Sequence, residues 1–237
     1  MSKPEPKSNL EWKEWGKNDP LFGVASWPGK QKGGSAPWTD AEFYELGKSD
    51  WAVFEKEWRS YGMNPESCVE IGCGAGRMTM QLANTFQSVV GVDVSEDMIA
   101  YARQHVTAAN ADFIVVNGTN LPRPDQSTTG VFSTHVFQHF DSLEYADLYF
   151  AEIARGVEDV ALVRLEQLYP FPHADFAEQI ALYPNAKSVV WAQEEPANQG
   201  AWHRIQHYLL EHLRPDQALS AAQRKSSASP AVGYLQL

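Results

Sequence analysis

The chain lacks the features that mark several large protein classes. It has two cysteines, Cys68 and Cys73, too few for a disulfide framework and at a spacing that matches no common zinc motif. We therefore expect both thiols to be reduced and structural. No apolar run is long enough to span a bilayer, and residues 1–10 lack the charged and then apolar layout of a signal peptide. The sequence thus predicts no membrane segment and a cytoplasmic protein.

Basic residues are also scarce. Lys and Arg together number 19 against 30 Asp and Glu, which gives a formal net charge of −11. A grip on the phosphate backbone needs clustered Lys and Arg, so we expect no nucleic-acid partner. Hydrophobic residues make up 43% of the 237, which is enough to bury a sizeable core.

The first 62 residues predict an N-terminal arm and cap. Residues 1–9 are polar and predict a disordered tail. Residues 10–40 carry four tryptophans among Gly, Pro and Lys, which favours a loop-rich arm packed on the body, because that much aromatic surface is costly to expose. Residues 40–62 have helical spacing interrupted by Gly47, which predicts two short helices or one broken helix.

Strands and helices alternate from residue 63 onward. Short apolar runs predict strands at 67–72, 88–94, 111–118 and 128–137, and helical patterns fall at 75–86, 95–107 and 143–155. Ser95 is a typical N-cap with acidic residues after it. The alternation continues with strands at 158–167 and 187–194 and helices at 173–184 and 199–215, before a small, polar tail from residue 220. We predict an α/β fold of Rossmann-like type, with a mostly parallel sheet and helices on both faces.

The strongest chemical motif is VEIGCGAGRMTM, residues 69–80. Gly72, Gly74 and Gly76 lie between a strand and a helix, where glycines permit a tight turn and a close ligand. Glu70 precedes this loop, and a carboxylate there suits an ammonium group. Asp93 ends the next strand, where it can accept hydrogen bonds from ribose hydroxyls. Arg77 stands where a dinucleotide-binding motif would have glycine, so the pattern favours a nucleoside with an amino-acid tail over NAD.

The stretch from about 67 to 155 resembles class I S-adenosylmethionine-dependent methyltransferases. The resemblance is carried by VEIGCGAG, VVGVDVSEDMIAYAR, FIVVNGTNLP and VFSTHVFQHF, and WGKNDPLFGV is similar to the N-terminal cap of some bacterial members. It implies a parallel-sheet fold that binds S-adenosyl-L-methionine. It places Glu70, Gly72, Gly74 and Gly76 around the methionine part and Asp93 on the ribose. Further residues are implied near the adenine (Val94, Met98, Asn117, Thr119, Asn120 and Leu121) or facing the methyl group and substrate (Ser133, His135 and Gln138).

Methyl transfer needs a base only when the acceptor must lose a proton. His135 and His139 are the candidates by residue type and place, and the alternative that each is a hydrogen-bonded loop histidine stays open. The pair His203 and His207 lacks the glutamate of a zinc-binding H-E-x-x-H motif, so we expect no metal there.

A second resemblance begins at about Asp159 and runs to Tyr234. The stretches DVALVRLEQLYPFP, YPNAK, VVWAQEEPANQGAW and SASPAVGY resemble the C-terminal end of the E1 component of 2-oxoglutarate dehydrogenase. It implies the end of a transketolase-type C-terminal domain, which helps to build a dimer and does not hold thiamin diphosphate. We therefore expect no thiamin-dependent activity from this chain. A polar cluster is expected at strand ends, either structural or regulatory: Arg164, Glu166, Glu194, Glu195 and Arg224.

Three parts follow from these patterns: an arm and cap at 1–62, an S-adenosylmethionine-binding half-domain at 63–156, and an E1-like segment at 157–237. Strands at 159–166 and 187–193 could extend the first sheet at its free edge. We expect methyl transfer to a small-molecule acceptor, impaired if the replaced C-terminal half matters. Two alternatives remain: a non-catalytic module that contacts 2-oxoglutarate dehydrogenase subunits through 159–237, and a non-functional chimera.

Overall fold

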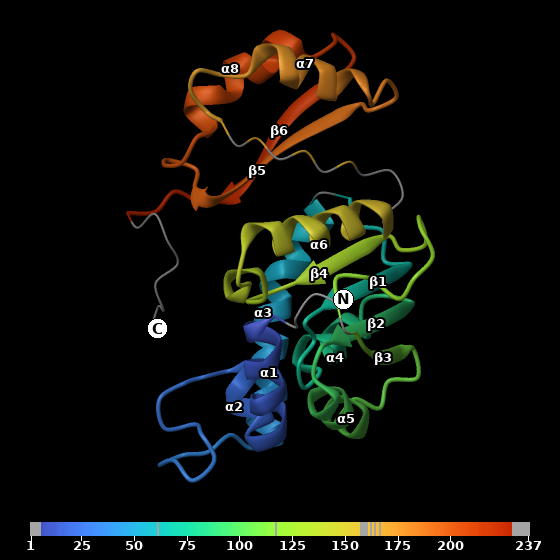
Figure 1. Ribbon diagram of the computed structural model, residues 1–237, viewed down its shortest axis with the longest axis vertical. Coiled ribbons are helices and arrows are strands. Elements are labelled where there is room, and N and C mark those ends of the chain that lie inside the picture. The colour runs from blue at the N-terminus through green and yellow to red at the C-terminus, as the bar shows by residue number, and fades with distance from the viewer. Residues whose placement is uncertain are drawn as a thin grey trace. The chain divides into compact units, whose positions relative to one another are not determined.

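The computed structural model describes residues 6–60, 62–116, 118–156, 161, 163, 165 and 167–228 (Figure 1). The chain divides into two compact units, unit 1 (Met1–Leu162) and unit 2 (Val163–Leu237), and each has its own core. No helix in the described ranges is long and apolar enough to cross a membrane.

Unit 1 is built on a four-stranded parallel sheet. Its strands are β1 (Ser67–Ile71), β2 (Ser88–Asp93), β3 (Ala111–Val115) and β4 (Gly130–Ser133), in the order β3-β2-β1-β4. All five residues of β1 are buried, as expected for a central parallel strand covered on both faces. The four strands predicted in this region are confirmed.

Helices cover both faces of this sheet. On one face, α4 (Arg77–Leu82) and α5 (Glu96–His105) pack with α3 (Asp40–Ser60) against Cys68, Val89 and Phe113. On the other, α6 (Leu143–Gly156) packs Tyr149 against Val69 and its neighbours (Figure 1). The Rossmann-like α/β prediction is confirmed. Cys68 and Cys73 are both buried and form no disulfide, as predicted.

The N-terminal arm is more helical than the sequence suggests. Helix α1 (Lys7–Asn18) begins within the predicted disordered tail, and Ser8 and Asn9 are buried. It is followed by α2 (Pro20–Val24), which Asp19 caps by accepting a hydrogen bond from the Phe22 amide at 3.3 Å. The arm packs on the body of unit 1, as predicted, with α1 and α2 against α5.

The break predicted at Gly47 is wrong, because α3 runs without interruption from Asp40 to Ser60. Gly47 is there for packing: a Cβ at this position would lie 2.7 Å from the backbone oxygen of Arg77. The glycine therefore lets α3 approach α4 closely, and the helix continues through it.

Unit 2 contains α7 (His173–Ala181), β5 (Ser188–Pro196), α8 (Trp202–His212) and β6 (Ala218–Arg224). Strands β5 and β6 form a two-stranded parallel sheet, and Phe171, Phe176, Ile205 and Leu209 form the core beneath the helices. The prediction that the strand near 187–193 extends the first sheet is wrong, since β5 pairs with β6.

Two further expectations for this region need comment. The tail from residue 220 contains most of β6, a strand that its small polar residues do not predict. Of the strand predicted at 158–167, positions 158–160, 162, 164 and 166 lie outside the described residues. Ala161, Val163 and Leu165 are described and are not in a strand. Three members of the expected polar cluster also lie outside what the structure describes: Arg164, Glu166 and the side chain of Glu194.

Candidate functional site

The glycine loop follows β1 directly. Gly72, Gly74 and Gly76 have φ values of +69°, +52° and +81°, in the left-handed region that favours glycine. The amides of Gly72 and Cys73 both donate to the carbonyl of Val92, at 2.8 and 3.0 Å, which ties the loop to the end of β2. Neighbouring side chains lie close: a Cβ on Gly72 would be 2.3 Å from Val136, and one on Gly74 would be 2.5 Å from Val24 of the arm.

Two carboxyl groups flank the loop. Asp93, at the end of β2, accepts from the Ser95 amide through Oδ1 and from the Gly74 amide through Oδ2, each at 2.9 Å. Burial raises the pKa of Asp93, and these backbone hydrogen bonds oppose the rise. Glu70 is 2% exposed and accepts from the hydroxyl of Thr79. Burial raises the pKa of Glu70 to about 8, against the opposing effects of the Thr79 hydroxyl and the Arg77 charge.

The residues predicted to border the adenine lie around the start of α5 and after β3. Met98 is buried and Val94 is half-buried. Helix α1 crosses here so closely that a Cβ on Gly16 would be 2.2 Å from Ser95 Oγ. In the loop after β3, Thr119 is half-buried, Asn120 is exposed, and the Leu121 amide donates to Glu152 at 3.3 Å. Asn117 lies outside the described residues.

The two candidate histidines after β4 have different surroundings. His135 is exposed and has a φ of +58°, which is uncommon outside glycine and found at functional sites. His139 packs edge-on against Trp12 of α1, with ring centroids 5.0 Å apart. Burial, and then the proximity of His135, lower the pKa of His139. Ser133 donates to the carbonyl of Ile71 at 3.2 Å and so joins the ends of β4 and β1.

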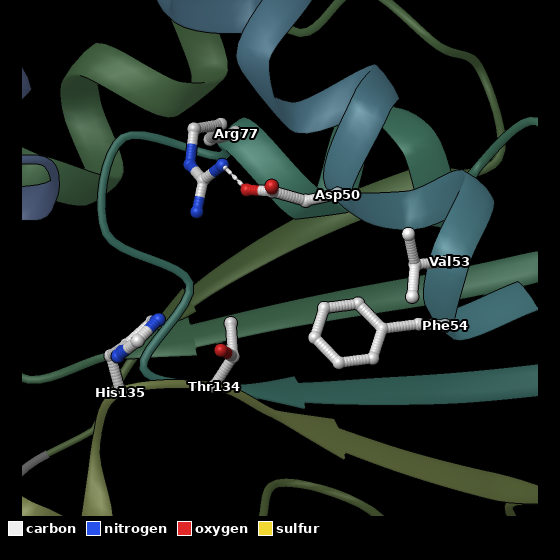
Figure 2. A pocket seen from close by; sticks show the side chains of 6 residues that line it. All are labelled: Asp50, Val53, Phe54, Arg77, Thr134 and His135. Atoms are coloured by element: carbon white, nitrogen blue, oxygen red, sulfur yellow. Dashed lines mark hydrogen bonds and ion pairs between the residues drawn. The ribbon is translucent and has the colours of Figure 1, made fainter. Parts of the chain in front are cut away.

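A cavity of about 210 Å³ lies beside His135 (Figure 2). Arg77, the first residue of α4, forms an ion pair with Asp50 of α3 in its wall. The sequence predicts His135 as a site residue, but it does not predict the part played by the three residues from α3, which are Asp50, Val53 and Phe54. The available signal was the helical spacing of positions 50, 53 and 54, which places them on one face of α3. The cavity is lined by Asp50, Val53, Phe54, Arg77, Thr134 and His135.

Comparisons with known proteins fall into two sets. Each part of the chain matches a different family. Residues 69–160 match the model of the methyltransferase domain, and residues 143–237 match that of the 2-oxoglutarate dehydrogenase C-terminal region. Both resemblances noted in the sequence are confirmed. The two matches overlap from 143 to 160, so α6 lies within both.

Curated relatives of the second part include E1 components of 2-oxoglutarate dehydrogenase. That of Cupriavidus necator is 52% identical over 90 residues, covering 38% of this chain and 10% of the relative. That of Azotobacter vinelandii is 50% identical over 93 residues, with coverages of 38% and 10%. The chain thus spans about a tenth of the length of these relatives.

A solved structure shares the fold of the first part. Phosphoethanolamine N-methyltransferase 1 of Haemonchus contortus, in complex with phosphoethanolamine and S-adenosylhomocysteine, is 18% identical with a TM-score of 0.51. The match covers 64% of this chain and 29% of that one.

Proposed function

We propose that this chain transfers a methyl group from S-adenosylmethionine to a small-molecule acceptor, using unit 1. The observation that carries the proposal is the arrangement around the glycine loop. Asp93 receives one backbone hydrogen bond on each carboxylate oxygen, and Glu70 is buried beside it. Both lie at the carboxyl ends of parallel strands, where open α/β sheets bind ligands.

The residues present fit this cofactor. Each oxygen of Asp93 has lone-pair capacity left to accept from a ribose hydroxyl. Burial raises the pKa of the Glu70 carboxyl, and an ammonium group beside it would favour its charged form. Gly72, Gly74 and Gly76 add no side chain of their own at the turn. Glu70 and these glycines would hold the methionine end, and Asp93 would hold the ribose.

The chain's own contribution to the reaction is positioning, shielding and proton removal. When bound, S-adenosylmethionine supplies a methyl group on a sulfonium that leaves as a neutral thioether. The arm covers the loop and the start of α5 through Val24 and Gly16, and so keeps water from this region. His135 lines the adjacent cavity, where its ring can accept the proton of an acceptor hydroxyl.

Calorimetric titration of the purified chain with S-adenosylhomocysteine tests this proposal. We expect binding in the micromolar range, and we expect Asp93→Ala to abolish it because the ribose loses its acceptor. Asp112→Ala is the matched control, because Asp112 is an exposed carboxylate on β3, away from the loop. Absence of heat with both S-adenosylhomocysteine and S-adenosylmethionine would refute the proposal.

We propose as a second candidate that residues 159–237 associate with 2-oxoglutarate dehydrogenase subunits. The support is the high identity to the E1 components, 52% over 90 residues for that of Cupriavidus necator. Full-length chain immobilised on beads should retain purified E1, and the variant Tyr169→Asp, at a side chain that is 87% exposed, should retain less. Failure of the wild-type chain to retain E1 would remove this candidate and leave the first intact.

A further inference from the structure

We infer that the cavity beside His135 binds the methyl acceptor, and that this acceptor is a small, single-ring hydroxy acid whose carboxylate meets Arg77. The inference rests on the proposed function and adds the chemical class of the acceptor. It begins from an arginine that is buried without a full set of partners.

Arg77 is held at the start of α4, and its side chain is only 8% exposed. Its Nη1 forms an ion pair with Asp50, but its buried Nε has no hydrogen-bond partner among the described residues. A buried donor without a hydrogen bond is costly in free energy, and the cost is larger when the donor belongs to a charged group. The guanidinium thus lies in the cavity wall with one donor unpaired, and Asp50 is its charge partner there.

Two opposite charges lie in the cavity wall, on Arg77 and Asp50, and they differ in their surroundings. Asp50 is 38% exposed, so water screens its carboxylate, whereas the guanidinium of Arg77 is nearly dry. The guanidinium also presents its donors as a planar fork, whose geometry matches a carboxylate. A cationic acceptor would meet this buried cation, while a carboxylate would satisfy it. The cavity therefore favours an acid over an amine.

The size and walls of the cavity restrict the rest of the ligand. Its volume of about 210 Å³ corresponds to roughly seven water molecules at about 30 Å³ each. It is below the roughly 300–1,000 Å³ of pockets for drug-sized ligands. Figure 2 shows Arg77 and Asp50 on one side, Thr134 and His135 on another, and the ring of Phe54 facing the space between them. A single aromatic ring can pack on Phe54 with its carboxylate at Arg77 and its hydroxyl at His135.

The test uses the full chain saturated with S-adenosylhomocysteine and titrated with three probes of one size: 4-hydroxybenzoate, 4-hydroxybenzamide and 4-hydroxybenzylamine. We expect the benzoate to bind about ten-fold or more tightly than the other two. Arg77→Gln should weaken benzoate binding by about ten-fold or more, because it removes a charge-assisted hydrogen bond.

Asp50→Asn gives an opposite expectation that misfolding cannot imitate. It removes the carboxylate that competes for Arg77, so benzoate should bind about three-fold or more tightly. Glu57→Gln is the matched control: it removes the same charge from an exposed position on α3 and should leave binding unchanged. For Arg77→Gln, binding of S-adenosylhomocysteine should be retained but weaker, because the Arg77 charge no longer favours the Glu70 carboxylate, and this retained binding shows that the fold is kept.

The outcomes separate this inference from the proposed function. If S-adenosylhomocysteine binds but benzoate does not, or if the amine binds best, the acceptor class is wrong and the proposed function stands. If S-adenosylhomocysteine fails to bind, the proposed function fails, and the same three probes on the ligand-free chain still decide which chemistry the cavity accepts. A benzoate affinity that neither Arg77→Gln nor Asp50→Asn changes would also overturn the inference.

Discussion

Glu70 is expected to make cofactor binding depend on pH. Its buried carboxyl has a pKa of about 8, so at pH 7 about nine-tenths of the molecules carry a proton on this group. A bound ammonium group favours the charged carboxylate, because opposite charges at close range lower the pKa of an acid. Binding of S-adenosylhomocysteine should therefore expel the proton from Glu70.

The size of the effect follows from the same pKa. The number of protons released on binding should be about 0.9 at pH 7, about 0.5 at pH 8 and about 0.1 at pH 9. Below pH 7 the affinity for S-adenosylhomocysteine should increase by close to ten-fold for each unit by which the pH is raised, because nearly one proton leaves per ligand bound. Above pH 9 Glu70 is already ionised, and its contribution to the pH dependence ends.

Calorimetry in two buffers with different ionisation enthalpies measures these protons, because the buffer takes them up. Glu70→Gln should abolish the difference between the buffers, since an amide has no proton to release. Glu66→Gln should preserve it, because Glu66 is exposed and precedes β1. If the Glu70→Gln protein binds the ligand with the same buffer-dependent heat as the wild type, the reasoning about Glu70 is wrong.

Two further predictions concern stability. Gly47→Ala should lower the free energy of unfolding by roughly 1–3 kcal/mol, despite the better helix propensity of alanine, because its Cβ would lie 2.7 Å from the Arg77 oxygen. Urea denaturation measures this, and Gly118→Ala, where a Cβ would meet nothing within 4 Å, should change stability by less than about 0.5 kcal/mol. The two units should also melt in separate calorimetric transitions. Leu82→Ala should destabilise one unit and Ile205→Ala the other, each lowering that unit's free energy of unfolding by about 2–5 kcal/mol, because these fully buried side chains lie in separate cores. A single transition shifted equally by both substitutions would contradict this.

Unit 1 was predictable where local patterns determine the structure. Strands β1 and β2 are short and mostly apolar, as buried parallel strands require, and Ser95 caps α5 by accepting from the Met98 amide at 3.3 Å. Elements that depend on distant contacts were missed. Strand β6 has only one large apolar residue, Leu219, and its extended form depends on pairing with β5. The continuity of α3 through Gly47 depends on the surface of α4.

The candidate site divides in the same way. Glu70 and Asp93 were placed correctly at strand ends because the motif fixes their distance from the glycine loop along the chain. Asp50 and Phe54 lie on α3, which precedes the glycine loop along the chain. No local motif indicates that they line a cavity with His135. Their role follows from how α3 packs on α4, which is set by tertiary structure and not by a local pattern.

The division of the chain at Leu162 has a consequence for its synthesis on the ribosome. Every described strand and helix of unit 1, and every residue of the candidate site, precedes the 75 residues of unit 2. At a translation rate of about 5–20 residues per second, those residues take roughly 4–15 s to make. Parallel strands with short crossovers fold within that time. Unit 1 should therefore fold as a nascent chain, before the E1-like segment has been completed.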